Sequence, residues 1–419
     1  MNKVLGVGCL VLAMLAACAQ CQEAAGKTKA STIKAPTAAI HQLKPLMHGG
    51  KPFFPIGAYG VPIGVDLKTL RKQGWNTVLD QGAATGTTDA MLKWLSDLQQ
   101  AGLVGIIGLG NLVREDKDAD VFRVVETLDN HPALLGYYLF DEPENHFYDA
   151  QKPNLKDLHF LIRHKIGWAH QAVRAAESHP DHYAFGCIAW WTEYRNLQSL
   201  CDVNMPNEYP SGNTKVEFEG QWPNVVYDAR LANEAAQANG GRGFVYTPMA
   251  VDSRAGIEMW RSPTANEFRY SAFAPITQGA MGMIFWAAYR CTKPYAEEVV
   301  FPVTRQLRAL TPFFLGEWVD DKLACEPSDS TTDLLKEYKL PAVSGCLRRA
   351  SDGRYLLLAV NNTPQPVNAT FRLSLKNLPS TAKDSLTGKK SPIKNGVIKD
   401  TLPAYGVRAF MLAPRKTGP

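Results

Sequence analysis

The sequence lacks the short motifs that mark several common kinds of catalytic site. It contains no phosphate-binding glycine loop, no Gly-x-Ser-x-Gly segment and no His-Glu-x-x-His segment. These absences argue against nucleotide, serine-hydrolase and zinc-protease chemistry. No pair of the eight cysteines has the spacing of a zinc site. We therefore expect no metal ion and no cofactor.

The chain also has little net charge. Its 419 residues carry a formal net charge of only +5, and no arginine-rich run is interleaved with aromatic residues. We therefore expect no nucleic acid partner. Hydrophobic residues make up 45% of the chain and charged residues 20%, which is enough to bury a sizeable core. Nine tryptophans and fifteen tyrosines supply rings that fill cores and can also stack on sugar faces.

The N-terminus has the pattern of an export signal. Lys3 precedes an apolar stretch, Val4 to Ala17, that is too short to span a bilayer. The closing residues Leu15-Ala16-Ala17-Cys18 resemble the bacterial lipobox. We expect residues 1–18 to be a lipoprotein signal peptide, with Cys18 lipid-modified, and residues 19–47 to be a tether. The mature protein would then lie outside the cytoplasm, anchored to the membrane of the cell envelope. The alternative is simple secretion after cleavage nearby.

Six cysteines remain once Cys9 and Cys18 are set aside. In an exported protein, Cys325 with Cys346 or Cys187 with Cys201 could form disulfides, although sequence does not establish their geometry. We expect the cysteines to be structural rather than reactive.

Between residues 48 and 315, short β-rich runs alternate with longer helical patterns, which indicates βαβ units and a parallel sheet. The predicted strands are Phe53–Tyr59, Trp75–Leu79, Val104–Leu109, Leu134–Phe140, Tyr183–Ala189, Val203–Pro206, Gly243–Pro248 and Gly282–Trp286. The predicted helices are Asp66–Gln73, Thr88–Ala101, Val121–Asp129, Leu155–Ala176, Val226–Ala238 and Thr264–Gly279. Eight such repeats predict a closed (β/α)₈ barrel.

The pattern changes after Pro312. Tyr355–Val360, Thr370–Leu373 and Arg408–Leu412 resemble short strands separated by turn residues. We predict that residues 316–419 form a small antiparallel β-sandwich, which serves as an accessory to the barrel because it shows no exposed tryptophan ladder.

Polar, acidic and aromatic residues follow the predicted barrel strands. In a barrel the C-terminal strand ends form one mouth, where active sites of this fold are built. We expect the mouth to include Tyr59, Asp80, Asp141, Trp190, Trp191, Asn207, Tyr209, Trp286, Tyr289 and Arg290 as substrate-binding residues, with Glu193 and Arg195 beside them. Some of the rings would be sugar platforms, and Trp286 has plain core packing as an equal alternative.

The stretch His131 to Glu144, HPALLGYYLFDEPE, delivers adjacent carboxylates to this mouth. Glycoside hydrolysis needs a carboxyl group whose raised pKa lets it protonate the leaving oxygen. Asp141 and Glu144 are placed to raise the pKa of Glu142 in this way. The alternative is a salt bridge or helix cap at the end of the barrel.

Three segments together resemble barrels of glycoside hydrolase clan A, the β-galactosidase and cellulase superfamily. They are Gly50–Gly57 (GKPFFPIG), the HPALLGYYLFDEPE stretch, and Ile276–Trp286 (ITQGAMGMIFW). The likeness covers roughly residues 48 to 315. It implies an acid/base glutamate at the end of strand four, a position that Glu142 matches, and a nucleophile glutamate at the end of strand seven.

The sequence departs from the clan pattern in two places. Asp141 stands where asparagine is usual, and the predicted seventh strand contains no glutamate, so that its nearest acid is Asp252. Glu208, after strand six, is another candidate for the second catalytic carboxylate, with an ion pair to Arg290 or Arg254 as its structural alternative. A carboxyl separation of about 5 Å would suit a retaining mechanism and roughly 6.5 to 9.5 Å an inverting one.

These features predict a glycosidase that acts on extracellular oligo- or polysaccharide, with Glu142 as general acid/base and Glu208 or Asp252 as its partner. A surface carbohydrate-binding barrel without activity, and a lyase, are the alternatives. Sugar identity and oligomeric state do not follow from the sequence.

Overall fold

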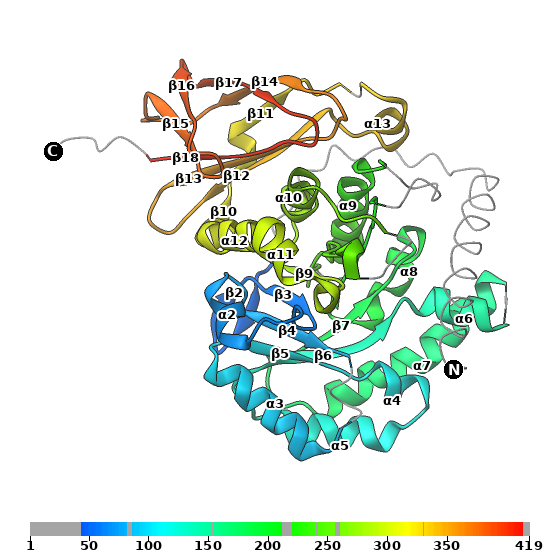
Figure 1. The fold of residues 1–419 in the computed structure, drawn as a ribbon. Helices are drawn as coiled ribbons and strands as arrows, with labels where there is room; N and C mark the ends of the chain where they lie inside the picture. Colours follow the sequence, from blue (N-terminus) through cyan, green and yellow to red (C-terminus); the bar gives the residue numbers. More distant parts are fainter. Residues whose placement is uncertain are drawn as a thin grey trace.

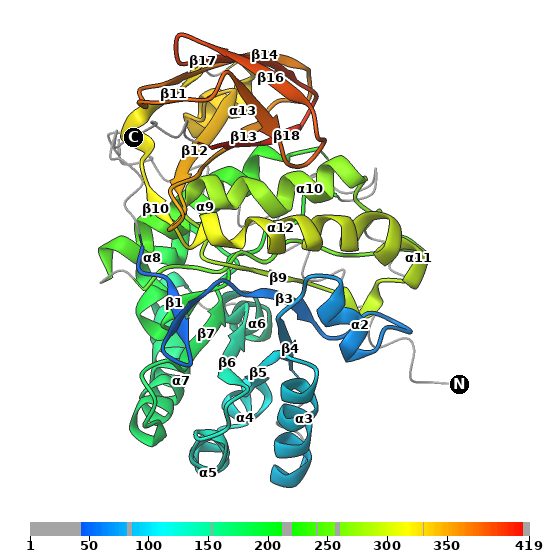
Figure 2. The ribbon, with the colours of Figure 1, turned by 90° about the vertical axis from the view of Figure 1, so that its left-hand side faces the viewer.

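The computed structural model describes residues 43–81, 86–151, 154–211, 220–239, 242–255, 260–329 and 331–413. The predicted signal peptide, its Cys18 and most of the predicted tether lie outside the described residues. Within the described ranges, no helix is long and apolar enough to cross a membrane. Figures 1 and 2 show a body of helices and strands with a second, mainly β body above it.

The larger body is the predicted parallel barrel. A hairpin of β1 (Leu46–His48) and β2 (Lys51–Phe53) precedes it. The barrel strands lie in the spatial order β8-β7-β6-β5-β4-β3-β9, and every neighbouring pair is parallel. They are β3 (Ile56–Tyr59), β4 (Thr77–Asp80), β5 (Val104–Gly108), β6 (Leu134–Asp141), β7 (Tyr183–Cys187), β8 (Val203–Asn204) and β9 (Met283–Phe285).

The eighth position of the barrel is filled by a segment around residues 244–249 that pairs through isolated bridges. Phe244 pairs with Asn204 of β8, while Tyr246 and Met249 pair with Met283 and Trp286 on the β9 side. Its amide groups alternate between the two neighbours, because Val245 bonds to β8 and Tyr246 bonds to the residue before β9. This segment therefore closes the barrel where the sequence predicts a strand.

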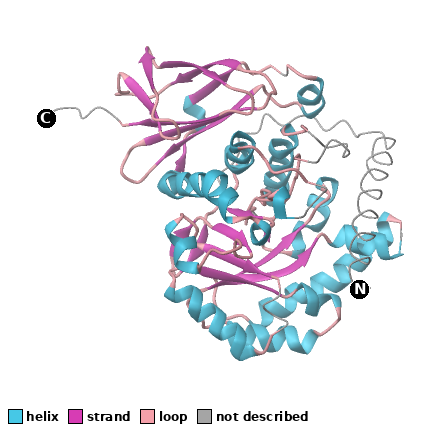
Figure 3. Cartoon of the chain, in the orientation of Figure 1, coloured by secondary structure: helices cyan, strands magenta, loops and turns pink. Residues whose placement is uncertain are grey.

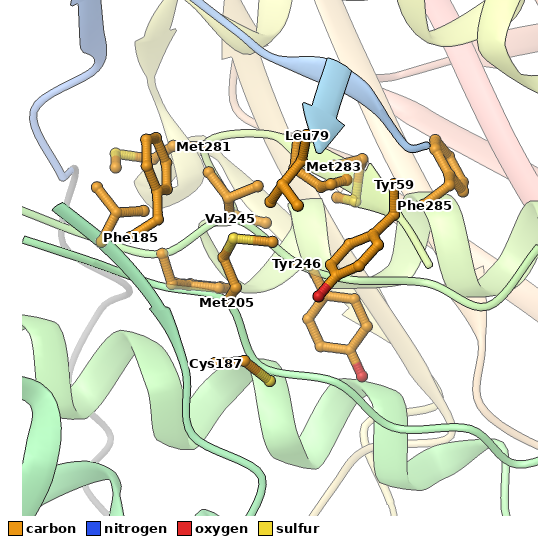
Figure 4. Packing of buried hydrophobic residues seen from close by; sticks show 14 of the residues in the cluster. Tyr59, Leu79, Phe185, Cys187, Met205, Val245, Tyr246, Met281, Met283 and Phe285 are labelled. Carbon is orange, nitrogen blue, oxygen red and sulfur yellow. The ribbon is translucent and has the colours of Figure 1, made fainter. Parts of the chain in front are cut away.

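The strands are almost continuously apolar because parallel barrel strands are buried on both faces. In β6, every residue from Leu134 to Phe140 is buried. Side chains from several strands meet inside the barrel, among them Tyr59, Leu79, Phe185 and Met283 (Figure 4). The interior is therefore a packed core, and polar chemistry is confined to the strand ends.

Helices cover the outside of the barrel, as Figure 3 shows. Their faces follow from sequence spacing: in α3, Met91, Leu95 and Leu98 recur at helical intervals and are buried, and the side chain of Thr87 caps the helix. The helices are α2 (Leu67–Lys72), α3 (Thr88–Gln100), α4 (Gly110–Arg114), α5 (Asp118–Leu128), α6 (Pro143–Gln151), α7 (Leu155–Ala176), α8 (Tyr194–Leu197), α9 (Pro223–Ala238), α10 (Ala265–Phe273), α11 (Lys293–Tyr295) and α12 (Phe301–Phe314).

The second body is the predicted antiparallel sandwich. Its strands follow the order β10-β12-β13-β18-β15-β16-β17-β14-β11, folded into two layers around an apolar interior. They are β10 (Glu317–Trp318), β11 (Leu323–Glu326), β12 (Val343–Arg349), β13 (Tyr355–Asn361), β14 (Val367–Leu373), β15 (Thr381–Asp384), β16 (Lys390–Lys394), β17 (Val397–Leu402) and β18 (Val407–Leu412), with α13 (Asp333–Tyr338) between β11 and β12.

The sandwich packs on the barrel through one face of its central strands. Along β13, Leu357 and Ala359 point into the sandwich, whereas Leu356, Leu358 and Val360 belong to the same apolar cluster as the barrel core. The contacts on the barrel side come from α10 and from the 3₁₀ turn Ala274–Gln278 that follows it. Both faces of β13 are therefore buried.

The described cysteines are free thiols. Cys187, Cys201, Cys325 and Cys346 carry no disulfide, so the two suggested pairings are wrong. Cys325 packs toward the sandwich interior and Cys346 toward the barrel. Because they lie on opposite sides of a sheet, they are not oriented to be joined.

Candidate active site at the barrel mouth

The end of β6 is irregular, and this irregularity directs its acidic residues. The pairing of β6 with β7 shifts register between Tyr138 and Phe140. A bulge of this kind changes which face successive side chains occupy, so Tyr138 and Asp141 come within hydrogen-bonding distance although they are three residues apart. The Phe140 ring lies over Gly186 of β7, where an added Cβ would sit 2.1 Å from the ring.

Asp141 is held by side chains from neighbouring strands. Its Oδ1 accepts a hydrogen bond from the Tyr138 hydroxyl at 2.6 Å. Its Oδ2 accepts from Gln81 Nε2 at 2.9 Å and from the Tyr59 hydroxyl at 3.4 Å. The three donors belong to or directly follow β3, β4 and β6, so Asp141 connects the ends of these strands. Asp141 is therefore an exposed carboxylate with a fixed orientation.

Glu142 turns toward the other half of the mouth. Its φ of 46° is in the left-handed region, which is uncommon for glutamate, and its amide donates to the Cys187 carbonyl at 3.0 Å. Its Oε1 accepts from Asn207 Nδ2 at 2.6 Å and its Oε2 from Asn145 Nδ2 at 2.9 Å. Unusual backbone conformations of this kind cluster at functional sites.

The pKa of Glu142 is raised above its ordinary value. Burial is the largest cause, and the neighbouring charge of Asp141 adds to it. The hydrogen bonds from Asn207 and Asn145 act in the opposite direction, because they stabilise the ionised carboxylate. A carboxyl group in these surroundings can carry a proton at higher pH than an exposed glutamate.

Glu144 binds the backbone next to the site. It is fully buried, and its Oε1 accepts from the Trp190 amide at 2.7 Å. Burial raises the pKa of Glu144 to about 8, which favours its protonated form. The Trp190 indole Nε1 donates to Asn145 Oδ1 at 2.5 Å. Since that oxygen is the acceptor, the other end of the Asn145 amide must be the donor to Glu142.

A group of three rings is linked to Glu142 through Asn207. Asn207 Nδ2 also donates to the Tyr209 hydroxyl at 3.1 Å, which links the carboxylate to the rings. Tyr209 stacks on Trp286, with ring centroids 4.6 Å apart, and meets Trp260 edge-on at 5.8 Å. All three rings are partly exposed. A partly exposed aromatic group next to a carboxylic acid can present apolar faces to the C–H side of a sugar.

Two predicted carboxylates have their interactions elsewhere. Glu208 accepts a hydrogen bond from Asn224 of α9 at 3.2 Å, and burial raises its pKa to about 7. The suggested pairing of Glu208 with Arg254 does not occur, because Arg254 binds Asp252, with Nε to Oδ1 at 2.9 Å.

Asp252 is enclosed in its own network. It is fully buried and accepts from Thr292, from the Arg254 backbone amide and from the Arg254 side chain. Burial raises the pKa of Asp252, but the hydrogen bonds from Arg254 and Thr292 outweigh it and hold the pKa below its ordinary value. Within the described part of the chain, Asp252 binds Arg254, Thr292 and Ser262 rather than Glu142, which suits a structural ion pair.

The remaining predicted residues divide between the rim of the mouth and the helical layer. Asp80 ends β4 beside Gln81. Tyr289 and Arg290 lie in the turn after β9, exposed, with the guanidinium 5.5 Å from the ring centroid. Trp191 instead packs edge-on against Tyr227 of α9 at 5.0 Å.

Glu193 and Arg195 are placed away from the mouth, contrary to the prediction. Glu193 is buried against His159 of α7, and Arg195 pairs with Glu234 of α9 at 3.1 Å. Both residues therefore stabilise the helical layer. Glu267 forms the capping box of α10 with Thr264.

Sequence reasoning placed Gln81 at the mouth beside Asp80, but it did not identify Tyr138, Asn145 and Trp260 as parts of the site. Tyr138 lies inside an apolar strand and Asn145 inside a helix, where polar groups carry no mark of function. Gln81 directly follows Asp80 at the strand end, and that position was the available signal. Trp260 lies in a segment distant from any strand end, so no periodic pattern indicates it.

The fold is similar to that of known glycoside hydrolases. A structure described only as a glycoside hydrolase shares 14% identity, covers 90% of this chain and 96% of its own, and has a TM-score of 0.59. A glycoside hydrolase family 5 protein from Bacteroides vulgatus shares 12% identity over 89% of this chain and 91% of its own, at a TM-score of 0.55. The cold-adapted β-galactosidase from Rahnella sp. R3 shares 11% identity over 88% of this chain and 100% of its own, at 0.51.

These likenesses confirm the predicted resemblance to clan A-like barrels at the level of fold. No protein-family model matches the chain, and no curated protein sequence matches it. The structural neighbours are glycoside hydrolases, and the roles of individual residues rest on the geometry of the mouth.

Proposed function

We propose that the protein is a glycoside hydrolase that acts on oligo- or polysaccharide, with Glu142 as its general acid/base. One observation carries the proposal: at the end of β6, Glu142 feels the charge of Asp141 and is linked through Asn207 to Tyr209, which packs against Trp286 and Trp260. This is the placement that an acid needs if a sugar packs on the rings.

Glu142 has the properties of a proton donor to a leaving oxygen. Burial and the Asp141 charge favour its protonated form. As the glycosidic bond breaks, the proton moves to the departing oxygen, and the carboxylate that remains is stabilised by the amide groups of Asn207 and Asn145. The same carboxylate can then take a proton from the water that completes hydrolysis.

The second anionic group of the reaction is assigned to Asp141 on the same strand end. Its charge acts on Glu142, whereas Glu208 and Asp252 are engaged with α9 and with Arg254. Hydrogen bonds from Tyr138 and Gln81 hold Asp141 in place. In this position it would stabilise the positive charge that develops on the sugar ring in the transition state.

The test is a comparison of Glu142→Gln with the wild-type protein on a panel of glycans and unactivated glycosides, followed by chromatography of released sugars. We expect turnover to fall by at least about 100-fold, because general acid catalysis contributes about 10² to 10⁴. Glu234→Gln, which alters a carboxylate of the helical layer, is the matched control and should keep full activity.

Other outcomes distinguish the alternative functions. Glycan binding without release of sugar by the wild-type protein would support a binding protein. Unsaturated products that absorb in the ultraviolet would support a lyase. Full activity of Glu142→Gln on unactivated substrates would refute the acid assignment.

We also propose that the protein is exported and lipid-anchored through Cys18. The support is the Leu15-Ala16-Ala17-Cys18 segment that ends the apolar N-terminal stretch. Metabolic labelling with tritiated palmitate tests this, since the label should be absent from Cys18→Ala. Label of equal intensity in both proteins would count against the anchor.

A further inference from the structure

A buried cluster of potential metal ligands lies at the end of the barrel opposite the mouth. Asp129 is the C-cap residue of α5, Glu177 is the C-cap residue of α7, and His182 directly precedes β7. The exposed fractions of the three side chains are 4%, 2% and 8%. Because this end carries the N-terminal ends of the strands, the cluster is independent of the proposed hydrolase site.

The separations of the two carboxylate oxygens from the His182 ring nitrogen are close to those of a tetrahedral metal site. His182 Nδ1 lies 3.2 Å from Asp129 Oδ1 and 3.7 Å from Glu177 Oε1. One ligand atom from each of the three residues lies within 4.8 Å of the other two. Zinc bonds of about 2.0 to 2.2 Å give edges of roughly 3.3 to 3.6 Å between tetrahedral ligands. The two measured separations bracket this value.

Glu177 supplies a second, separate indication. Both of its buried oxygens lack a hydrogen-bond partner, and Oε1 lies 3.7 Å from His182 Nδ1. The Arg174 guanidinium lies 2.7 Å from the other oxygen, Oε2. A buried carboxylate oxygen without a donor is costly and calls for an explanation, and a cation between Glu177, Asp129 and His182 would provide one.

Groups around the cluster already orient the ligands. Asp129 Oδ2 accepts hydrogen bonds from the Ser178 amide, at 2.8 Å, and from the Ser178 hydroxyl, which leaves Oδ1 directed at His182. Arg174 forms an ion pair with the other oxygen of Glu177 at 2.7 Å. Outer partners of this kind fix the orientation of metal-binding carboxylates.

We propose that Asp129 Oδ1, Glu177 Oε1 and His182 Nδ1 bind a zinc ion, with the fourth position left for water. An imidazole nitrogen beside two carboxylate oxygens suits zinc, whereas calcium and magnesium prefer oxygen ligands throughout. The ion would join the ends of α5 and α7 to the start of β7 and so stabilise the barrel. The three ligands form no sequence motif, because they come from three separate elements.

The test uses the full-length protein after removal of metal with a chelator. Zinc chloride is added, unbound metal is removed by gel filtration, and the zinc that remains is measured by mass spectrometry. We expect one zinc ion per wild-type chain and a melting temperature several degrees higher than that of the metal-free protein. Glu177→Gln and His182→Asn should each weaken zinc binding by more than about 10-fold.

The matched control is His179→Asn, which alters an exposed imidazole whose ring centroid lies 5.2 Å from that of His182. This variant should retain zinc. A second measurement needs no variant: cobalt bound to the wild-type protein should give the visible absorption of a tetrahedral site. Zinc retention no greater than in His182→Asn, equal stabilisation by calcium chloride, or cobalt without a tetrahedral spectrum would each overturn the proposal.

Discussion

The opposing influences on the pKa of Glu142 can be separated by mutation. Asn207 donates a hydrogen bond of 2.6 Å to Glu142 and so favours the ionised form, whereas the charge of Asp141 favours the protonated form. Asn207→Ala should therefore raise the pKa of Glu142, and Asp141→Asn should lower it. The two changes lie on either side of one carboxyl group, which makes the signs of the two shifts a stringent test.

The size of the shift follows from the hydrogen bond. A hydrogen bond to a charged group contributes about 1.5 to 3 kcal/mol, and one pKa unit corresponds to about 1.4 kcal/mol. Because Glu142 is partly exposed, water can replace part of the lost interaction. We therefore expect the lower end of the range, a rise of about 1 unit in Asn207→Ala.

The assay is the pH dependence of kcat/KM on a glycoside with a poor leaving group, for which protonation matters most. A general acid must be protonated, so activity falls as the pH rises through its pKa. The alkaline limb should move to higher pH in Asn207→Ala and to lower pH in Asp141→Asn, and should stay in place in Glu234→Gln. Shifts of both variants in one direction, or an unmoved limb, would refute the reasoning.

Two further predictions concern stability. Gly136→Ala should destabilise the fold by about 3 kcal/mol or more, because Gly136 has φ +155° and an added Cβ would lie 2.1 Å from the Tyr183 carbonyl oxygen. The control is Gly167→Ala in α7, where the nearest neighbour of the added Cβ lies at 3.5 Å. In chemical denaturation this control should be neutral or stabilising. For Glu144, whose folded pKa of about 8 exceeds its ordinary 4.5, the contribution to stability is present below about pH 4.5 and is lost as the pH rises through about 8. Glu144→Gln should therefore melt at a temperature that depends less on pH across this window in calorimetry, and an unchanged pH dependence would contradict the assignment.

The sequence was sufficient for the architecture because the barrel is specified by local patterns. Apolar runs such as Leu134–Phe140 have no alternating polar side, which is typical of buried parallel strands. The predicted helix Leu155–Ala176 agrees with α7 at both ends. Its apolar face and its Asn154 cap are local features of the sequence. The predicted strand at residues 243–248 is less regular than expected, since it pairs through single bridges.

The candidate site was only partly predictable. Strand order placed Asp141, Glu142 and Asn207 at one mouth, since all three follow parallel strands. It did not show that the bulge near Phe140 and the left-handed backbone at Glu142 would send the adjacent acids in different directions. Partners such as Asn145 depend on side-chain geometry across elements. The prediction that Glu193 lies at the mouth was wrong for the same reason. Its contact with His159 of α7 joins two elements that are distant in the sequence.

The burial of β13 on both sides limits how this chain can be rearranged. Leu356, Leu358 and Val360 cover apolar surface that belongs to the barrel core. A barrel cut off at residue 315 would expose that surface to water and would tend to aggregate. Recombination that replaces the C-terminal part with an unrelated module would meet the same obstacle, so we expect the two parts to be inherited together and to unfold in a single transition.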